Sequence, residues 1–115
     1  MSEFTKWRDY LRGFASEREW EQFHNPKNLA MALTVEAGEL MELFQWLTPK
    51  QAENPDNELK ERAGEELSDV ILYSIRMADK LGIDLDRAIA RKSKMNEEKY
   101  PIEKAKGIAK KYTDL

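Results

Sequence analysis

Two stretches of this sequence place apolar residues at helical spacing, and this pattern limits the fold more than any other feature. Between residues 29 and 47, and again between residues 59 and 77, apolar side chains recur every three or four positions. Such spacing puts one stripe of side chains along an amphipathic helix, whereas a half-buried strand would need strict alternation. Each stripe is interrupted once by a carboxylate. The stripes are Leu29, Leu33, Glu36, Leu40, Phe44 and Leu47, and then Leu59, Ala63, Glu66, Val70, Tyr73 and Met77.

Capping residues and prolines predict where the first two helices begin and end. Ser2 can cap a helix that runs to about Arg18. Asn25 can cap a second helix, and Pro26 suits its first position because the missing N–H costs nothing there. We expect this second helix to reach about Leu47. The polar segment that follows, with two prolines and no apolar period, predicts a loop.

Similar signals bound two further helices and complete an all-α chain. The third is expected over about residues 58–81, ending at Gly82, which suits the residue after a helix. Asp84 can cap a fourth helix, which should end at or before Pro101. The sequence therefore predicts one domain over residues 1–101 and a basic tail over 102–115. Apolar residues on a second side of the third helix predict a homo-oligomer; they include Leu67, Ile71, Ala78 and Leu81.

Composition and charge disfavour several classes of function. The chain contains no cysteine, which excludes disulfides and thiolate metal sites. Its net charge of −3 makes a nucleic-acid polymer an unfavourable partner. No apolar run approaches the roughly 18 residues that a membrane span needs, and the first residues lack a signal-peptide pattern. These features fit a cytoplasmic protein with no membrane partner.

The two interrupting carboxylates are each followed by another acid three residues later, Glu39 after Glu36 and Asp69 after Glu66. Positions i and i+3 adjoin on one helix face, so four acids converge if the two stripes meet. Two like charges about 4 Å apart repel by roughly 4 kcal/mol at an effective dielectric near 20. Such a cluster must protonate, spread apart or hold a cation. Oxygen ligands alone suit Mg²⁺ or Mn²⁺, whose open positions can take phosphate oxygens and water.

A non-catalytic interpretation stays open from the residues alone. Most acidic residues on helices are solvated, and a single pair at this spacing is weak evidence for a metal site. The chain could instead be a helical interaction module whose acids pair with basic residues of a partner. A module of that kind should bind Mg²⁺ weakly and hydrolyse nothing.

Several segments resemble the MazG-like all-α nucleotide pyrophosphohydrolases, and among them the dCTP pyrophosphatase branch. They are "FHNPKNL", "VEAGELMELFQW", "EELSDVILYSIRMADKLGIDL" and "KSKMNEEKYP", within residues 14–101. The resemblance implies a helical bundle of the NTP pyrophosphatase type, with helices that pair between chains in dimers or tetramers. It also implies Mg²⁺-dependent hydrolysis of a nucleoside triphosphate to the monophosphate and pyrophosphate. Many members have two consecutive glutamates at the first motif, whereas Val35 precedes Glu36 here.

The resemblance also assigns roles to individual positions. Glu36, Glu39, Glu66 and Asp69 match the metal-binding acids, and Glu39 is our choice for the group that activates the attacking water. Residues expected at the substrate are Lys92 and Asn96 near the triphosphate, Tyr73 near the sugar, and Trp20, His24 and Trp46 at the base.

Each substrate residue has a structural alternative. The tryptophans could be core or interface anchors, His24 a packing or capping residue, and Tyr73 a core residue. Glu21 and His24 form half of a di-iron signature, but a ferritin-like site needs two such pairs. We expect dCTP as the substrate, with dUTP or a modified nucleotide as the second choice.

Overall fold

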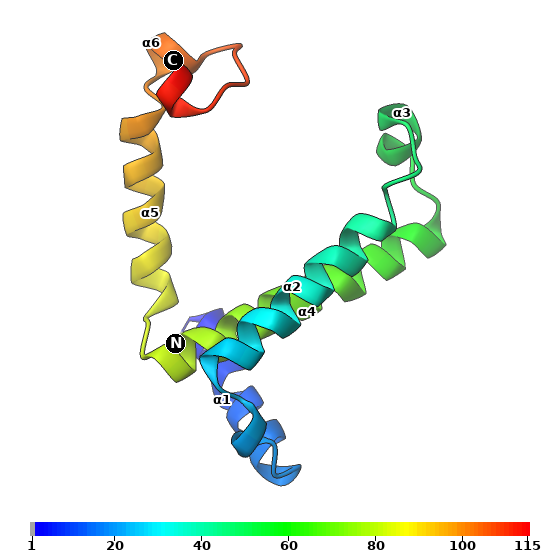
Figure 1. The fold of residues 1–115 in the computed structure, drawn as a ribbon, viewed down its shortest axis with the longest axis vertical. Helices are drawn as coiled ribbons and strands as arrows, with labels where there is room; N and C mark the ends of the chain where they lie inside the picture. The colour runs from blue at the N-terminus through cyan, green and yellow to red at the C-terminus, as the bar shows by residue number, and fades with distance from the viewer. Residues whose placement is uncertain (1) are drawn as a thin grey trace. The chain divides into compact units, whose positions relative to one another are not determined.

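A computed structural model describes residues 2–115 of the chain, and all regular elements in that range are helical (Figure 1). The predicted all-α class is therefore confirmed. The α-helices are α1 (Glu3–Glu17), α2 (Pro26–Glu42), α3 (Pro49–Glu53), α4 (Asn57–Leu81), α5 (Leu85–Lys99) and α6 (Ile102–Ala105), with 3₁₀ turns η1 (Glu21–Phe23) and η2 (Tyr112–Asp114). Within residues 2–115 no helix combines the length and the apolar character that crossing a bilayer requires.

The predicted caps are formed at the helix ends. The Ser2 hydroxyl accepts the Thr5 N–H at 3.1 Å, and the Asn25 side chain accepts the Asn28 N–H at 2.9 Å. Each such bond satisfies one of the free N–H groups of a first turn. Gly82 ends α4 in the left-handed conformation, with φ at 69°. These interactions are local, which is why sequence alone located them.

The segment between α2 and α4 differs from the prediction. α2 ends at Glu42, five residues before the expected Leu47, because the chain tightens into turns there. The N–H of Leu43 bonds to a carbonyl only three residues back, at 3.2 Å. The expected loop contains α3, which a reciprocal pair of hydrogen bonds between Thr48 and Gln51 caps.

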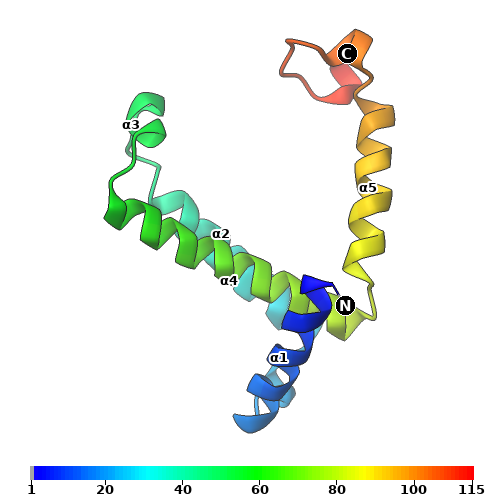
Figure 2. The ribbon, with the colours of Figure 1, turned by 180° about the vertical axis from the view of Figure 1, so that it is seen from behind.

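The chain divides into two compact units between Ile83 and Asp84. In the first unit α2 and α4 run antiparallel and side by side, and α1 packs on α4 (Figures 1 and 2). The second unit contains α5, α6 and η2. There the Tyr112 N–H donates to the Tyr100 hydroxyl at 3.2 Å, and Lys99 lies 4.8 Å from the Tyr112 ring centroid. The division of the sequence at residue 101 stays a prediction.

Few side chains of the first unit are fully buried. The apolar ones are Ala15, Leu29, Ile75 and Ala78. Ala78 therefore belongs to the core, which corrects its expected place on an uncovered face: it lies on the part of α4 against which α1 packs. Leu67, Ile71 and Leu81 are about half exposed, as the second apolar side of this helix predicted.

Candidate active site

Three carboxylates from α2 and α4 meet on the packing face of the antiparallel pair. Glu36 and Glu39 come from α2 and Glu66 from α4, and one oxygen from each lies within 4.8 Å of the others. We call these three residues the acidic cluster. Asp69 lies one turn farther along α4, exposed to solvent, and is not one of the three. The two helices therefore meet where their apolar stripes predicted, and Asp69 lies at the edge of the acidic cluster.

The acidic cluster is electrostatically uncompensated in the described residues. The pKa of Glu36 is raised to about 7. The largest cause is its contact with Glu66, followed by burial and by its neighbours Glu39 and Asp69. One oxygen of Glu66 is buried and has no hydrogen-bond partner among residues 2–115. Without a cation, a proton held on Glu36 reduces the repulsion, since adjacent carboxylates cannot all ionise freely.

The residues of the cluster fit a divalent cation. All three donors are carboxylates, which hard ions such as Mg²⁺ and Mn²⁺ prefer. The unpaired Glu66 oxygen is the kind of buried polar atom that requires a partner. A bound cation would supply that partner and offset the repulsion at Glu36. The cluster can therefore hold a metal.

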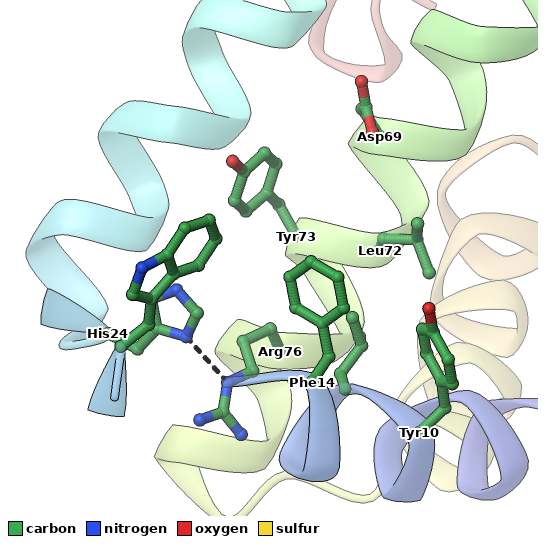
Figure 3. A pocket seen from close by; sticks show the side chains of 9 residues that line it. Tyr10, Phe14, His24, Asp69, Leu72, Tyr73 and Arg76 are labelled. Atoms are coloured by element: carbon green, nitrogen blue, oxygen red, sulfur yellow. Dashed lines mark hydrogen bonds between the residues drawn. The ribbon is translucent and has the colours of Figure 1, made fainter. Parts of the chain in front are cut away.

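A mostly aromatic pocket of about 260 Å³ lies against the C-terminal half of α4 (Figure 3). Asp69, which lines it, lies three residues along α4 from Glu66 of the acidic cluster. We call this hollow the aromatic pocket. Its volume lies just below the roughly 300–1,000 Å³ of pockets that hold drug-sized ligands. It therefore suits one flat ring with a few substituents. The lining residues are Tyr10, Leu11, Phe14, Trp20, His24, Asp69, Leu72, Tyr73 and Arg76.

The end of α1 directs Trp20 and His24 to this pocket. Glu19 adopts a left-handed conformation, with φ at 56°, and the next residue turns back so that the Trp20 N–H donates to the Ala15 carbonyl at 2.9 Å. The Trp20 ring then lies edge-on to Phe14, with 5.7 Å between centroids. It lies 6.2 Å from the His24 ring, so the two rings share one side of the pocket.

Arg76 also lines the aromatic pocket and was not identified from the sequence. It is 3% exposed, and its Nε–H donates to His24 Nδ1 at 3.0 Å. Its guanidinium also bonds to Glu21 and, at 3.3 Å, to Asp79. Around it Lys80 bonds to Glu21, and Arg12 bonds to Asp79 at 2.8 Å. We call these five charged residues, Arg12, Glu21, Arg76, Asp79 and Lys80, the Arg76 cluster.

Comparison with known proteins identifies the family. A model of the MazG-like family matches residues 31–115, which include most of α2, all of α4 and the acidic cluster. The chain belongs to the MazG-like family. The match covers both acid motifs, so the resemblance to this family is confirmed.

Relatives of this MazG-like chain include curated mammalian proteins and a solved structure. It is 48% identical to dCTP pyrophosphatase 1 of Rattus norvegicus and 45% identical to that of Homo sapiens, each over 104 residues. Those matches cover 89% of this chain, which spans about 61% of the length of these relatives. A pyrophosphatase crystal structure from Archaeoglobus fulgidus superposes with a TM-score of 0.78 at 35% identity, covering 88% of this chain and 94% of the other.

The remaining residues expected at the substrate are not all brought together. Tyr73 lines the aromatic pocket, and burial, followed by Glu36 and Asp69, raises its pKa. Trp46 does not line it and is 87% exposed. Lys92 and Asn96 are exposed on α5, four residues apart and therefore on one face of it. The roles of these four residues stay predictions.

Two arginines of the MazG-like chain line hollows of the candidate site and were not identified from the sequence. Arg62 lines a second hollow, of about 550 Å³, together with Glu39 and Glu66 of the acidic cluster. Arg76 follows Tyr73 of the apolar stripe by three residues. A cation at such a position is the same signal that identified Glu36 and Glu66, applied to the opposite charge.

Proposed function

We propose that this chain catalyses the hydrolysis of a nucleoside triphosphate, with dCTP favoured, to the monophosphate and pyrophosphate. The observation that carries the proposal is the acidic cluster with its partnerless Glu66 oxygen beside a pocket sized for one ring. The names of the mammalian relatives and of the archaeal structure support the same reaction. Asp69 and Tyr73 lie between the two features on α4, so one ligand can reach both.

The proposed cofactor is Mg²⁺, with Mn²⁺ as a substitute. Glu36, Glu39 and Glu66 would hold it, with Asp69 as a fourth oxygen donor at the edge. When bound, it would offset the charge of the triphosphate oxygens and the charge that builds as the bond between the α- and β-phosphates breaks. The acids alone would repel the substrate.

Glu39 is the proposed general base. Among the three cluster carboxylates it is the exposed one, whereas Glu36 and Glu66 are half-buried. One of its oxygens therefore has access to water, and would accept the proton that the attacking water loses. Lys92 keeps its predicted role as a point charge that holds the leaving pyrophosphate. Asn96 keeps its predicted role as a hydrogen-bonding group for a phosphate oxygen or the sugar.

The aromatic pocket is the proposed base site. The Trp20 ring offers a flat face, and stacking on such a face contributes roughly 1–3 kcal/mol per base without choosing among bases. Choice must come from hydrogen bonds and from size, and a pocket of about 260 Å³ favours one ring over a fused pair. Tyr73 near the sugar would disfavour a 2′-hydroxyl by contact. Trp46 is assigned to the base end from the resemblance alone.

We also propose a homodimer or homotetramer in which α2 and α4 of two copies complete a four-helix bundle. The antiparallel pair buries one side of each helix and leaves the other uncovered. Met31 and Val35 of α2 are 59% and 58% exposed, and Leu67 and Ile71 of α4 are 48% and 51% exposed. Each pair is four residues apart, so each helix presents an apolar stripe outward. Light scattering should show more than one copy at micromolar concentration, and Ile71→Lys should shift the assembly toward the monomer.

The deciding experiment is product analysis over dCTP, dTTP, dUTP, dATP and CTP with Mg²⁺ present. We expect dCMP and pyrophosphate, with the highest kcat/KM for dCTP, and losses of activity in Trp20→Ala, His24→Ala and Trp46→Ala. Hydrolysis in ¹⁸O-labelled water will show whether the α- or the β-phosphorus is attacked. Preference for dUTP or a modified nucleotide would replace the substrate assignment. Absence of any hydrolysis, together with weak Mg²⁺ binding, would favour the interaction module.

A further inference from the structure

The contact between Arg76 and His24 decides which nitrogen of the histidine ring carries a proton. An arginine side chain has five N–H donors and no acceptor. Because its Nε–H points at His24 Nδ1 at 3.0 Å, that nitrogen must present its lone pair (Figure 3). In the neutral ring the proton then sits on Nε2. The geometry therefore selects the Nε2–H tautomer, whereas an isolated histidine populates both tautomers.

The surroundings hold Arg76 in this role. Its side chain is nearly fully buried and bonded on one side to Glu21 and on the other to Asp79. Both acids lie outside the aromatic pocket, whereas His24 lines it. The two terminal nitrogens of the guanidinium donate to the acids, and the Nε–H donates to the histidine. Burial first, and then the Arg76 charge, lower the pKa of His24, although Glu21 opposes and Lys80 reinforces this. The lowered pKa favours the neutral ring, which is the form that can accept the Arg76 N–H at Nδ1.

We propose that Arg76 is a positioning residue that holds His24 as an Nε2–H donor toward the ligand of the aromatic pocket. This inference rests on the proposed function for the identity of the ligand, which is a base that presents a carbonyl oxygen or ring nitrogen. The 2-carbonyl and N3 of cytosine are such acceptors. A base that presents only a donor at that point would leave the His24 N–H unpaired, at a loss of roughly ten- to hundredfold in kcat/KM.

The test uses the fact that His24 is the sole histidine of the chain. In protein labelled with ¹⁵N-histidine, each ring nitrogen gives one unambiguous signal, and its shift reports whether it carries a proton. We expect an unprotonated Nδ1 and a protonated Nε2 at pH 7.5. A spectrum with the proton on Nδ1, or with both nitrogens averaged, would overturn the inference.

A variant and a matched control separate positioning from general stability. Arg76→Met removes every donor but keeps an unbranched side chain out to the level of Nε. It strands neither acid, because Glu21 keeps Lys80 and Asp79 keeps Arg12. It should give averaged nitrogen signals and a KM for dCTP raised about tenfold or more, with kcat changed less. Arg12→Gln breaks an outer pair of the same cluster and should keep the wild-type spectrum. An unchanged spectrum in Arg76→Met would refute the positioning role.

Titration with dCMP, without metal, tests the pocket side of the inference. Binding should shift the Nε2 signal of the wild type while Nδ1 changes little. Hydrolysis of dCTP combined with an Nε2 signal that dCMP does not move would refute the base contact. Failure to hydrolyse any nucleotide would refute the proposed function while the Nδ1 signal still decides the role of Arg76.

Discussion

Helix α4 carries charged side chains into two partly buried places, and opposite charges within the described residues compensate only one of them. In the Arg76 cluster every charge has an opposite charge within 4.0 Å, and the pKa values of Glu21 and Asp79 are lowered by their cationic partners. In the acidic cluster no carboxylate has such a partner among residues 2–115. There the pKa of Glu36 is raised instead.

The contrast separates a charge that holds the fold from a charge that awaits a ligand. Burying a charge is costly unless an opposite charge compensates it. The Arg76 cluster provides that compensation within the chain. The acidic cluster lacks it, so a cation must supply it or a proton must remain. The same helix can thus be structural at one end and chemically incomplete nearer its middle.

The sharpest way to break this contrast is to neutralise the acidic cluster. Glu36→Gln and Glu66→Gln should each lower kcat/KM by more than about 100-fold, because even outer partners of metal ligands cost 10–100-fold when removed. Helix content by circular dichroism should stay normal, since each change removes a repelling charge. Glu65→Gln is the matched control: it is exposed on the same helix and should keep normal activity. Near-normal rates in either cluster variant would contradict the metal assignment.

Metal binding should also appear as stability. A ligand that binds only the folded state at a hundredfold excess over its Kd raises the free energy of unfolding by about 2.7 kcal/mol. Urea unfolding with saturating Mg²⁺ should show such a gain over chelated protein, together with loss of activity in chelator. In Glu66→Gln the gain should largely disappear. An equal gain in that variant would place the ion elsewhere.

Removing one acid of the Arg76 cluster should have a smaller effect, measured here on stability. Glu21→Gln takes one partner from buried Arg76, which keeps Asp79 and His24, so the expected loss is about 1–3 kcal/mol. Glu17→Gln, in an exposed pair with Arg18 at 3.9 Å, should cost about 0–1 kcal/mol. Urea unfolding of the two variants measures the difference. Equal losses would mean that burial of Arg76 does not matter.

The sequence predicted most of the helix bounds because caps are local. It also predicted the meeting of Glu36 and Glu66, since an acid in an apolar stripe must face the neighbouring helix. The predicted end of α2 at about Leu47 was wrong, since the helix ends at Glu42. The Thr48–Gln51 capping box was an available signal for α3. The contact of Arg76 with His24 spans 52 positions, and no periodic pattern links residues so distant.

Stability should depend on pH with opposite signs in the two regions. In metal-free protein the raised pKa of Glu36 gives a contribution that is complete below about 4.5 and is lost as pH rises through about 7. The lowered pKa values of Glu21 and Asp79 give contributions that are present above their ordinary ranges and lost as pH falls. The lowered pKa of His24 gives a contribution to stability that is present above about pH 6.5 and is lost at lower pH.

Because His24 opposes Glu36 between pH 5.5 and 8, the test must compare variants at each pH. Wild type and Glu36→Gln share every titrating group outside the acidic cluster and Asp69, so their difference isolates Glu36 and the neighbours that it contacts. In chelator, Glu36→Gln should gain stability relative to wild type as the pH rises from 5.5 to 8, measured as the shift in urea midpoint. With saturating Mg²⁺ the order should reverse, because the wild type alone keeps all its ligands. A difference that is the same at both pH values would mean that Glu36 titrates normally and that its neighbours do not crowd it.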